Sequence, residues 1–389
     1  MYVQLYEGRE QTEVKHKILE RYLSAFAPIV GTWAADVTYV DCLAGPWEAR
    51  GEHLEDTSFA RAIKVLREAK SALQLRGKTP SFRCLLVENN PDNFQRLSEF
   101  TRTVTDIEVT AKQWDFSRHI DDIVRFANLR KKSIPFFFID PKGWELIAID
   151  LIKPLLRLSP GEVLINLMTS WIKRFLSDES KNFERLLGPD VGRLRQLSGD
   201  EQEEELVRCY ANSVKNAGGF NYVCTLPVLK ADADMIHFWM VYGTRHPKGV
   251  EEFKNTEKIV VPFMHQARAE AQQRKRFLNS GGQFPLLAPE ATYVERRLTR
   301  LEEKNEASAR TDLQELLQQS DSIPFDDAWA RTMQFSLVRE ADLKEWIKEW
   351  VTNGNLEILG LQPNEKGPKR RAGHRLKWLK SRHDKASDR

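Results

Sequence analysis

Acidic residues end four apolar segments in the first half of the chain. They are Asp41, Glu88, Asp115, which lies just past its segment, and Asp140. The segments are rich in β-branched and aromatic residues, which predicts strands, and the carboxyl ends of parallel strands meet at one edge of a sheet. A carboxylate accepts hydrogen bonds from hydroxyl and amine groups. A single acid at a strand end is usually only solvated, but four in register predict a binding site for a ligand with such donors.

The turns after the first and last of these acids add residues suited to ligand contact. Ala44 and Gly45 follow Asp41, and a glycine lets the backbone approach a ligand closely. An ordinary turn whose glycine serves only packing explains the same residues, and this motif alone does not separate the two interpretations. Pro141 and Trp144 follow Asp140. The indole of Trp144 either stacks on a flat ligand or caps the core of the sheet, and both interpretations stay open.

Hydrophobic periodicity predicts the elements that carry these residues. Apolar residues recur at helical spacing over 13–30, which predicts an amphipathic helix ahead of the first strand. The basic residues Lys15, His16 and Lys17 near its start either face solvent or contact a ligand. Strands that alternate with helices predict an α/β fold with a mainly parallel, seven-stranded sheet. The predicted strands cover 38–41, 82–88, 107–111, 134–140, 162–167, 220–223 and 235–242.

Charge is distributed unevenly along the chain. The whole chain has a formal net charge of +3 at pH 7, yet residues 361–389 hold ten Lys and Arg against three Asp and Glu. The difference, +3 minus +7, leaves −4 for the residues before them. Because local basic surfaces attract phosphate, the C-terminal segment is expected to bind nucleic acid.

Cysteine usage and hydropathy bear on the class of protein. The four cysteines, Cys42, Cys84, Cys209 and Cys224, lack the spacing of a zinc site or a disulfide framework. We therefore expect free thiols, a reducing compartment and no structural metal. No run is apolar and long enough for a transmembrane helix, and the N-terminus does not resemble a signal peptide. These features predict a cytoplasmic protein.

Composition changes after Pro262, where the chain becomes polar and basic. The triplet Ser280-Gly281-Gly282 further on predicts a linker. We therefore expect an α/β domain over 1–264, a helical linker over 265–300 and a C-terminal domain with a basic tail over 301–389.

The C-terminal domain has the predicted outline of a winged helix, with two helices, a strand, a basic loop and a strand. The wing of such a domain commonly contacts a duplex backbone. Docking on another protein is the alternative, in which case the basic loop is only a solvated hairpin tip. In the α/β domain, Lys173 and Arg174 either contact phosphate or form the solvated face of a helix. The basic residues of the wing and of the strand after it are Lys366, Lys369, Arg370, Arg371, Arg375 and Lys377.

Together the motifs Asp-x-Leu-Ala-Gly-Pro, Leu-Val-Glu, Asp-Phe and Phe-Ile-Asp-Pro-x-Gly-Trp resemble the S-adenosylmethionine-dependent methyltransferase fold. More narrowly, Lys15-His16 with Leu19 and Tyr22-Leu23, followed by the stretch 39–46 and by Ile139-Asp140-Pro141, resembles the bacterial three-Cys-motif partner proteins. This resemblance covers about the first two-thirds of the chain. It implies a Rossmann-like class I methyltransferase fold, S-adenosylmethionine as the cofactor, and a radical-SAM-like partner protein with three cysteines.

The resemblance also implies roles for individual residues. Asp41, Ala44 and Gly45 would line the methionine part of the cofactor, Glu88 would hold the ribose hydroxyls, and Asp115 would meet the adenine amine. Asp140 and Pro141 would lie beside the transferable methyl, with Asp140 and the Pro141 carbonyl accepting the hydrogens of an exocyclic amine. Trp144, the third predicted catalytic residue, would stack on the base. The implied activity is methylation of nucleic acid, with amino groups favoured.

Two positions depart from the pattern of this family. Trp47 stands where a second glycine is usual, and Lys142 stands where amino-methyltransferases have proline or an aromatic residue. Both departures favour an alternative in which a degenerate cofactor fold and the winged helix act as an adaptor for the radical-SAM-like partner.

Overall fold

The computed structural model describes residues 3–45, 49–52, 54–178, 183–280 and 296–379. It divides the chain into two compact units, unit 1 over Met1–Val294 and unit 2 over Glu295–Arg389. The domain boundaries drawn from composition, at 264/265 and 300/301, both fall inside helices, which are α10 (Pro247–Asn279) and α11 (Arg296–Gln319). The polar residues after Pro262 belong to the second half of α10, where most side chains are partly or fully exposed. A change in composition there marks a solvated helix surface, while Gly281 and Gly282 of the predicted linker lie outside the described residues.

Unit 1 is built on a seven-stranded sheet in the order β3-β2-β1-β4-β5-β7-β6. Strands β1 to β5 pair in parallel, whereas β7 is antiparallel to both of its neighbours. The predicted α/β class with a mainly parallel seven-stranded sheet is therefore confirmed, and the fold is Rossmann-like. The strands are β1 Asp36–Asp41, β2 Ser81–Glu88, β3 Glu108–Gln113, β4 Ser133–Ile139, β5 Glu162–Leu167, β6 Tyr222–Leu229 and β7 Ile236–Thr244.

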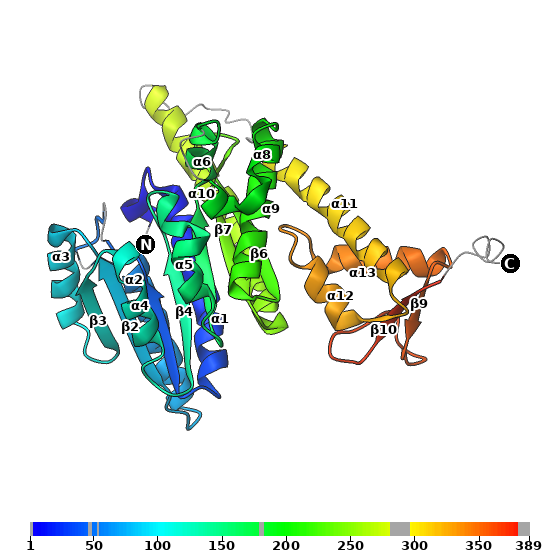
Figure 1. Cartoon of the computed structure of the whole chain (residues 1–389), viewed down its shortest axis with the longest axis horizontal. Coiled ribbons are helices and arrows are strands. Elements are labelled where there is room, and N and C mark those ends of the chain that lie inside the picture. Colours follow the sequence, from blue (N-terminus) through cyan, green and yellow to red (C-terminus); the bar gives the residue numbers. More distant parts are fainter. Residues whose placement is uncertain (1–2, 46–48, 53, 179–182, 281–295, 380–389) are drawn as a thin grey trace. The chain divides into compact units, whose positions relative to one another are not determined.

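Helices cover both faces of the sheet (Figure 1). Helix α1 packs against α2 and α10. Phe59 of α2 also contacts Phe100 of α3, with ring centroids 5.1 Å apart, so α1, α2, α3 and α10 form one group of packed helices. A second group is formed by α5, which packs against α4 and α9. Along the chain the helices before α10 are η1 Val3–Tyr6, α1 Glu10–Gly31, α2 Ser58–Gln74, α3 Pro91–Arg102, η2 Phe116–Arg118, α4 Ile120–Ala127, η3 Glu145–Ile147, α5 Ile149–Leu156, α6 Thr169–Phe175, α7 Glu184–Leu187, η4 Gly188–Asp190, α8 Val191–Leu194 and α9 Gly199–Gly218.

The core lies around β4, in which every residue is buried. A strand covered by helices on both faces needs apolar residues on both, which explains the unbroken run of Phe136, Phe137 and Phe138. Strand β6 continues beyond the predicted 220–223 and contains Pro227. Proline lacks an N–H for the ladder, and the position of β6 at the sheet edge tolerates that loss.

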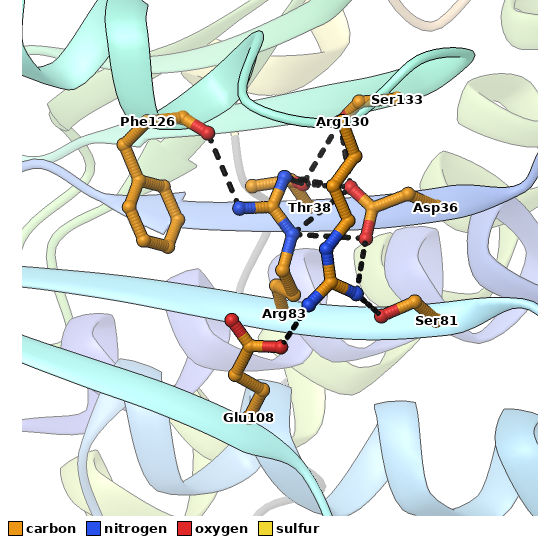
Figure 2. A network of polar contacts seen from close by, with 8 residues as sticks. All are labelled: Asp36, Thr38, Ser81, Arg83, Glu108, Phe126, Arg130 and Ser133. Atoms are coloured by element: carbon orange, nitrogen blue, oxygen red, sulfur yellow. Dashed lines mark hydrogen bonds and ion pairs between the residues drawn. The ribbon is translucent and has the colours of Figure 1, made fainter.

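A buried ion pair joins the amino ends of the central strands (Figure 2). The Arg83 guanidinium in β2 donates to both carboxylate oxygens of Asp36 in β1, at 2.9 Å from Nε and 2.7 Å from Nη2. Ser133 of β4 adds a hydrogen bond to Asp36 at 2.7 Å, and Arg130 lies 3.7 Å away on the solvent side. Burial acts to raise the pKa of Asp36, but the hydrogen bonds from Arg83, Ser133 and Thr38 outweigh it and lower that pKa. This network joins β1, β2 and β4 at their amino ends, the edge of the sheet opposite the acids at the carboxyl ends.

In its described part, residues 296–379, unit 2 has three helices and a three-stranded antiparallel sheet in the order β8-β10-β9. Strand β8 precedes the second helix and was not predicted, because two residues are too short for a periodic pattern. The side chains of Leu343, Trp346, Ile347 and Trp350 in α13 are buried. After α11 the elements are β8 Ile323–Pro324, α12 Phe325–Thr332, α13 Glu340–Thr352, β9 Leu356–Leu359 and β10 Arg375–Trp378.

Three predictions of the sequence concern metals, thiols and membranes. All four cysteines are buried, and none of them forms a disulfide. Within the described residues, no group of three or more His, Cys, Asp or Glu side chains is arranged to hold a metal ion. None of the helices in the described ranges combines the length and hydropathy needed to cross a bilayer.

Candidate functional site

Asp41 ends β1 and is completely buried. Its Oδ2 accepts hydrogen bonds from the Tyr39 hydroxyl at 3.0 Å and the Ser58 hydroxyl at 2.6 Å, and its Oδ1 accepts one from the Leu43 amide at 3.4 Å. Burial raises the pKa of Asp41 to about 6, and the nearby charge of Asp140 acts in the same direction. The carboxylate therefore joins the end of β1 to the start of α2 and to the turn between them.

The turn after Asp41 continues the ladder between its two neighbouring strands. The Cys42 amide donates to the Phe138 carbonyl in β4 at 3.0 Å, and the Ala44 amide donates to the Val87 carbonyl in β2 at 2.7 Å. Ala44 is buried and Gly45 is half-buried. These bonds hold the small residues at the carboxyl edge of the sheet, while Trp47 lies outside the described residues.

Glu88 stands at the carboxyl end of β2 and is 5% exposed. Its Oε1 accepts a hydrogen bond of 2.6 Å from the Asn90 amide, and the Asn90 side chain in turn caps α3 by accepting from the Asn93 amide at 3.0 Å. Burial raises the pKa of Glu88, although the backbone amides of Asn90 and Asn89 and the charge of Lys142 oppose this shift. The carboxylate is thus oriented by its own turn at the carboxyl edge of the sheet.

Asp115 follows β3 and caps the short helix η2. Its Oδ1 accepts from both the amide and the hydroxyl of Ser117, at 2.9 and 2.6 Å, and the hydroxyl bond is the main cause of its lowered pKa. The rings of Trp114 and His119, which precede and follow Asp115 in the sequence, stack on each other. Their centroids are 5.1 Å apart, and the angle between their planes is 4°. The Asp115 side chain is 35% exposed, so this turn presents a carboxylate and an aromatic pair.

Asp140 follows β4 and has partners from two other elements. Its Oδ1 accepts a hydrogen bond of 2.6 Å from the Asn166 amide group in β5, and its Oδ2 forms an ion pair with Lys15 of α1. The Asp140 side chain remains 20% exposed. The Asp140 carboxylate is therefore held in a fixed orientation at the carboxyl edge of the sheet by Lys15 and Asn166. We call these three residues the edge triad.

The residues after Asp140 differ in their surroundings. Pro141 is buried and Lys142 is exposed. Trp144 is half-buried and packs against the buried Phe183, with ring centroids 4.8 Å apart. The indole of Trp144 thus has an aromatic partner within the protein.

The basic triplet at the start of α1 separates into three environments. Lys15 joins the edge triad, and Lys17 lies 4.0 Å from Glu20 on the partly solvated side. His16 is buried against the Tyr6 hydroxyl at 2.8 Å, and burial lowers its pKa well below the usual value. Periodicity does not distinguish these positions, because three successive residues of a helix face different directions.

Asn166 is the site residue that the sequence-based reasoning did not select. It is 2% exposed and lies in β5 between the apolar residues Ile165 and Leu167, where an amide side chain is unusual. Its Nδ2 donates to Asp140, whereas its buried Oδ1 has no hydrogen-bond partner among the described residues. A buried acceptor without a donor is costly, so this oxygen is suited to a ligand that brings an N–H or O–H group.

The six basic residues predicted for the wing and the strand after it are of two kinds. Four make contacts within the unit. Lys369 pairs with Glu365 at 3.0 Å, the Arg370 guanidinium lies 3.7 Å from the centroid of the Trp329 ring, the Arg371 amide donates to Asp326, and Arg375 donates to Ser322. Lys366 and Lys377 are exposed and have no hydrogen-bond or ion-pair partner within the described ranges.

His374 fixes the loop between β9 and β10. Its Nδ1 accepts from the Lys369 amide at 2.8 Å, so its Nε2–H donates to Glu365 at 3.0 Å. The amide of Gln362 and the ammonium of Lys369 are the main groups that lower the pKa of Glu365 to about 2. The basic loop is therefore an ordered hairpin connection at neutral pH.

Comparison with known proteins gives only distant structural similarity. No protein-family model matches the chain, and no curated protein matches it in sequence. Among solved structures, protein LPL1258 from Legionella pneumophila is similar with a TM-score of 0.36 and 11% identity, over 61% of this chain and 87% of that one. Human methyltransferase-like protein 13, crystallised with SAH, gives a TM-score of 0.32 and 11% identity over 73% of this chain and 98% of that one. A putative methyltransferase from Thermobifida fusca gives 0.32 and 11% over 62% and 82%. Scores this low do not determine what the chain binds.

Proposed function

We propose that the chain is an S-adenosylmethionine-dependent methyltransferase that acts on nucleic acid, as its resemblance to the three-Cys-motif partner proteins implies. The observation that carries this proposal is the gathering of polar side chains at the carboxyl ends of four adjacent strands. The strands β1, β2, β4 and β5 are neighbours in the sheet, and at their carboxyl ends lie Asp41, Glu88, Asp140 and Asn166. In α/β sheets this edge is where ligands bind.

The residues at this edge fit the proposed cofactor. Glu88 presents an oriented carboxylate at the position from which an acid binds ribose hydroxyls. Ala44 and Gly45 contribute only small side chains at their own positions in the turn after β1, and Asp115 offers an acceptor for the adenine amine. Asp41 is buried and accepts a hydrogen bond from the turn, so its proposed role is to hold the turn that contacts the cofactor. S-adenosylmethionine supplies an activated methyl group when it is bound.

Asp140 is the residue that we assign to the substrate amine. Lys15 and Asn166 fix its carboxylate, so that an amine hydrogen bonded to it has a defined direction and its lone pair faces the cofactor side. The unpaired Oδ1 of Asn166 provides a second acceptor in the same place. Two acceptors close together suit an amino group with two hydrogens, which supports amino-group methylation.

A second candidate function is that of an adaptor for a radical-SAM-like protein with three cysteines. Two observations favour it. Both oxygens of Asp140 already accept hydrogen bonds from the protein, and Lys142 places an exposed cation beside the site. An adaptor of this kind has no need to bind S-adenosylmethionine, so cofactor affinity separates the two candidates.

Changing Glu88 to Gln is expected to weaken S-adenosylmethionine binding by about 10- to 100-fold, because a hydrogen bond to a charged group contributes about 1.5–3 kcal/mol. Isothermal titration calorimetry of the full chain measures this affinity. Glu68→Gln is the matched control. Glu68 is an exposed acid on α2, and its replacement by Gln removes the same charge. Equal affinity in the two variants would contradict the ribose role of Glu88, and the absence of binding in the wild type would favour the adaptor.

Unit 2 is proposed to be a winged helix that binds nucleic acid through phosphate. Its element order, a helix, a strand, two helices and a two-stranded hairpin, supports this assignment, as does the ordered basic loop of that hairpin. Lys366 and Lys377 are the cations best placed for phosphate, because they are exposed and lack a partner among the described residues. Arg370 contributes to packing through its contact with Trp329 and is a poor probe of binding.

The double change Lys366→Ser/Lys377→Ser is expected to reduce the slope of log affinity against log salt by about 1.4–1.8, since each phosphate contact contributes about 0.7 on single strands and about 0.9 on duplex DNA. Fluorescence anisotropy of the full chain with labelled oligonucleotides at several salt concentrations measures the slope. Lys64→Ser/Lys78→Ser, which removes two exposed lysines of unit 1, is the control for net charge. An unchanged slope in the first variant would indicate that unit 2 docks on protein instead.

A further inference from the structure

Helix α6 presents an exposed tryptophan directly after β5. Trp171 is 44% exposed, whereas Thr169 and Ile172 of the same helix are fully buried. Arg174, three residues after Trp171, shares its exposed face. The helix therefore buries one side and directs an indole and a guanidinium into solvent.

The inner side of α6 is fixed by polar contacts to α9. The Thr169 hydroxyl donates to Glu203 at 2.5 Å, and the Lys173 ammonium donates to the Gly199 carbonyl at 2.9 Å. Glu203 is itself buried and lies 3.7 Å from Lys173. Lys173 therefore contacts α9 and is not directed outward. The same contacts to α9 hold the helix that carries the exposed residues of α6.

The exposed pair is arranged as an aromatic surface with an attached cation. The guanidinium carbon of Arg174 lies 5.5 Å from the centroid of the Trp171 ring, which is cation–π distance. Phe175 lies next to the same ring with centroids 6.4 Å apart. These contacts restrict the rotation of the indole yet leave almost half of Trp171 accessible.

We propose that Trp171 and Arg174 form a stacking platform for an unpaired nucleobase of a single-stranded nucleic acid. The proposal rests on the proposed function, because α6 begins three residues after Asn166, which holds Asp140. Chemistry on a base requires that base to leave a duplex or to be single-stranded already, and aromatic side chains then stack on bases of any sequence. The guanidinium complements the negative charge that accompanies the base.

Changing Trp171 to Ala is expected to weaken single-strand binding by about 5- to 100-fold, the range that loss of one base–aromatic stack produces. Anisotropy of the full chain with a mixed-sequence single-stranded oligonucleotide, as DNA and as RNA, measures the loss. Because stacking releases no counterions, the salt slope of the Trp171→Ala variant should equal that of the wild type. This distinguishes it from loss of a phosphate contact.

Two further variants make the test specific. Trp171→Phe keeps an aromatic face and should retain affinity within about 3-fold of the wild type. Trp33→Ala removes a tryptophan that is 61% exposed between α1 and β1, away from the carboxyl edge, and should leave affinity unchanged. Equal affinities of Trp171→Ala and Trp33→Ala, or no oligonucleotide binding by the wild type, would overturn the platform and point to a protein partner for α6.

Calorimetry of the same preparations separates failure of the platform from failure of the proposed function. Wild-type protein that binds oligonucleotide through Trp171 but not S-adenosylmethionine would retain the platform and refute the methyltransferase. Wild-type protein that binds the cofactor, with no effect of Trp171→Ala on oligonucleotide, would refute the platform alone. A Trp171→Ala variant that loses cofactor affinity to the same extent would also refute it, because the residue would then support the cofactor site.

Discussion

Asp140→Asn is expected to retain S-adenosylmethionine affinity within about 3-fold and to lose methyl transfer by about 100- to 10,000-fold, the range typical of a residue that handles the proton of the reacting group. In the proposed reaction the carboxylate accepts a hydrogen of the substrate amine, whereas an amide in its place offers one acceptor oxygen and a competing donor. Incorporation of tritiated methyl groups into total cellular RNA and DNA measures transfer, and calorimetry measures cofactor binding.

The other members of the edge triad provide the comparison. Lys15→Met removes the ammonium that holds Asp140 Oδ2, and Asn166→Ala removes the donor to Oδ1. Lys15 acts by positioning Asp140, whereas Asn166 both positions Asp140 and, in the proposed reaction, offers its own Oδ1 to the amine. Each change is expected to reduce transfer by about 10- to 100-fold. Methyl transfer by Asp140→Asn at the wild-type rate would remove Asp140 from the reaction. A wild type that binds the cofactor but labels neither RNA nor DNA would contradict nucleic acid as the substrate.

Arg83→Met is expected to destabilise unit 1 by about 3–5 kcal/mol, because it leaves the Asp36 carboxylate buried without its cation. Asp36 is 1% exposed and Arg83 is fully buried. Hydrogen exchange of the β1 and β2 amides measures the loss within unit 1. Arg130→Met is the control, since the Arg130 side chain is 42% exposed and an ion pair at the surface contributes about 0–1 kcal/mol.

The pH dependence of that loss follows from the lowered pKa of Asp36 in the folded wild type. A depressed carboxyl pKa stabilises the fold above the unfolded value of about 3.9, and this contribution disappears as the pH falls through the folded pKa. Without Arg83, burial raises the folded pKa of Asp36 instead. The destabilisation should therefore be greatest at neutral pH and smaller below about pH 4. A loss independent of pH would mean that Arg83 acts through packing alone.

Most elements of unit 1 follow from local patterns in the sequence. The run at β4 is apolar on both faces, so the sequence predicts a central strand, and all seven strands lie near their predicted positions. The ends of helices and strands were harder to predict where the local composition does not match the secondary structure. Helix α10 continues through a polar stretch because its exposed face needs no apolar residues, and β6 continues through Pro227 because it lies at an edge.

The sequence by itself determined which acids end the strands and therefore at which edge of the sheet the ligand site is predicted, since strand period and strand ends are local properties. The tertiary structure alone decided how those acids differ. Asp41 is buried under its turn, whereas Asp140 is held by Lys15 from 125 residues away and by Asn166 from the next strand. Such partners depend on how α1, β4 and β5 pack, and no local pattern encodes contacts between residues so far apart in the chain.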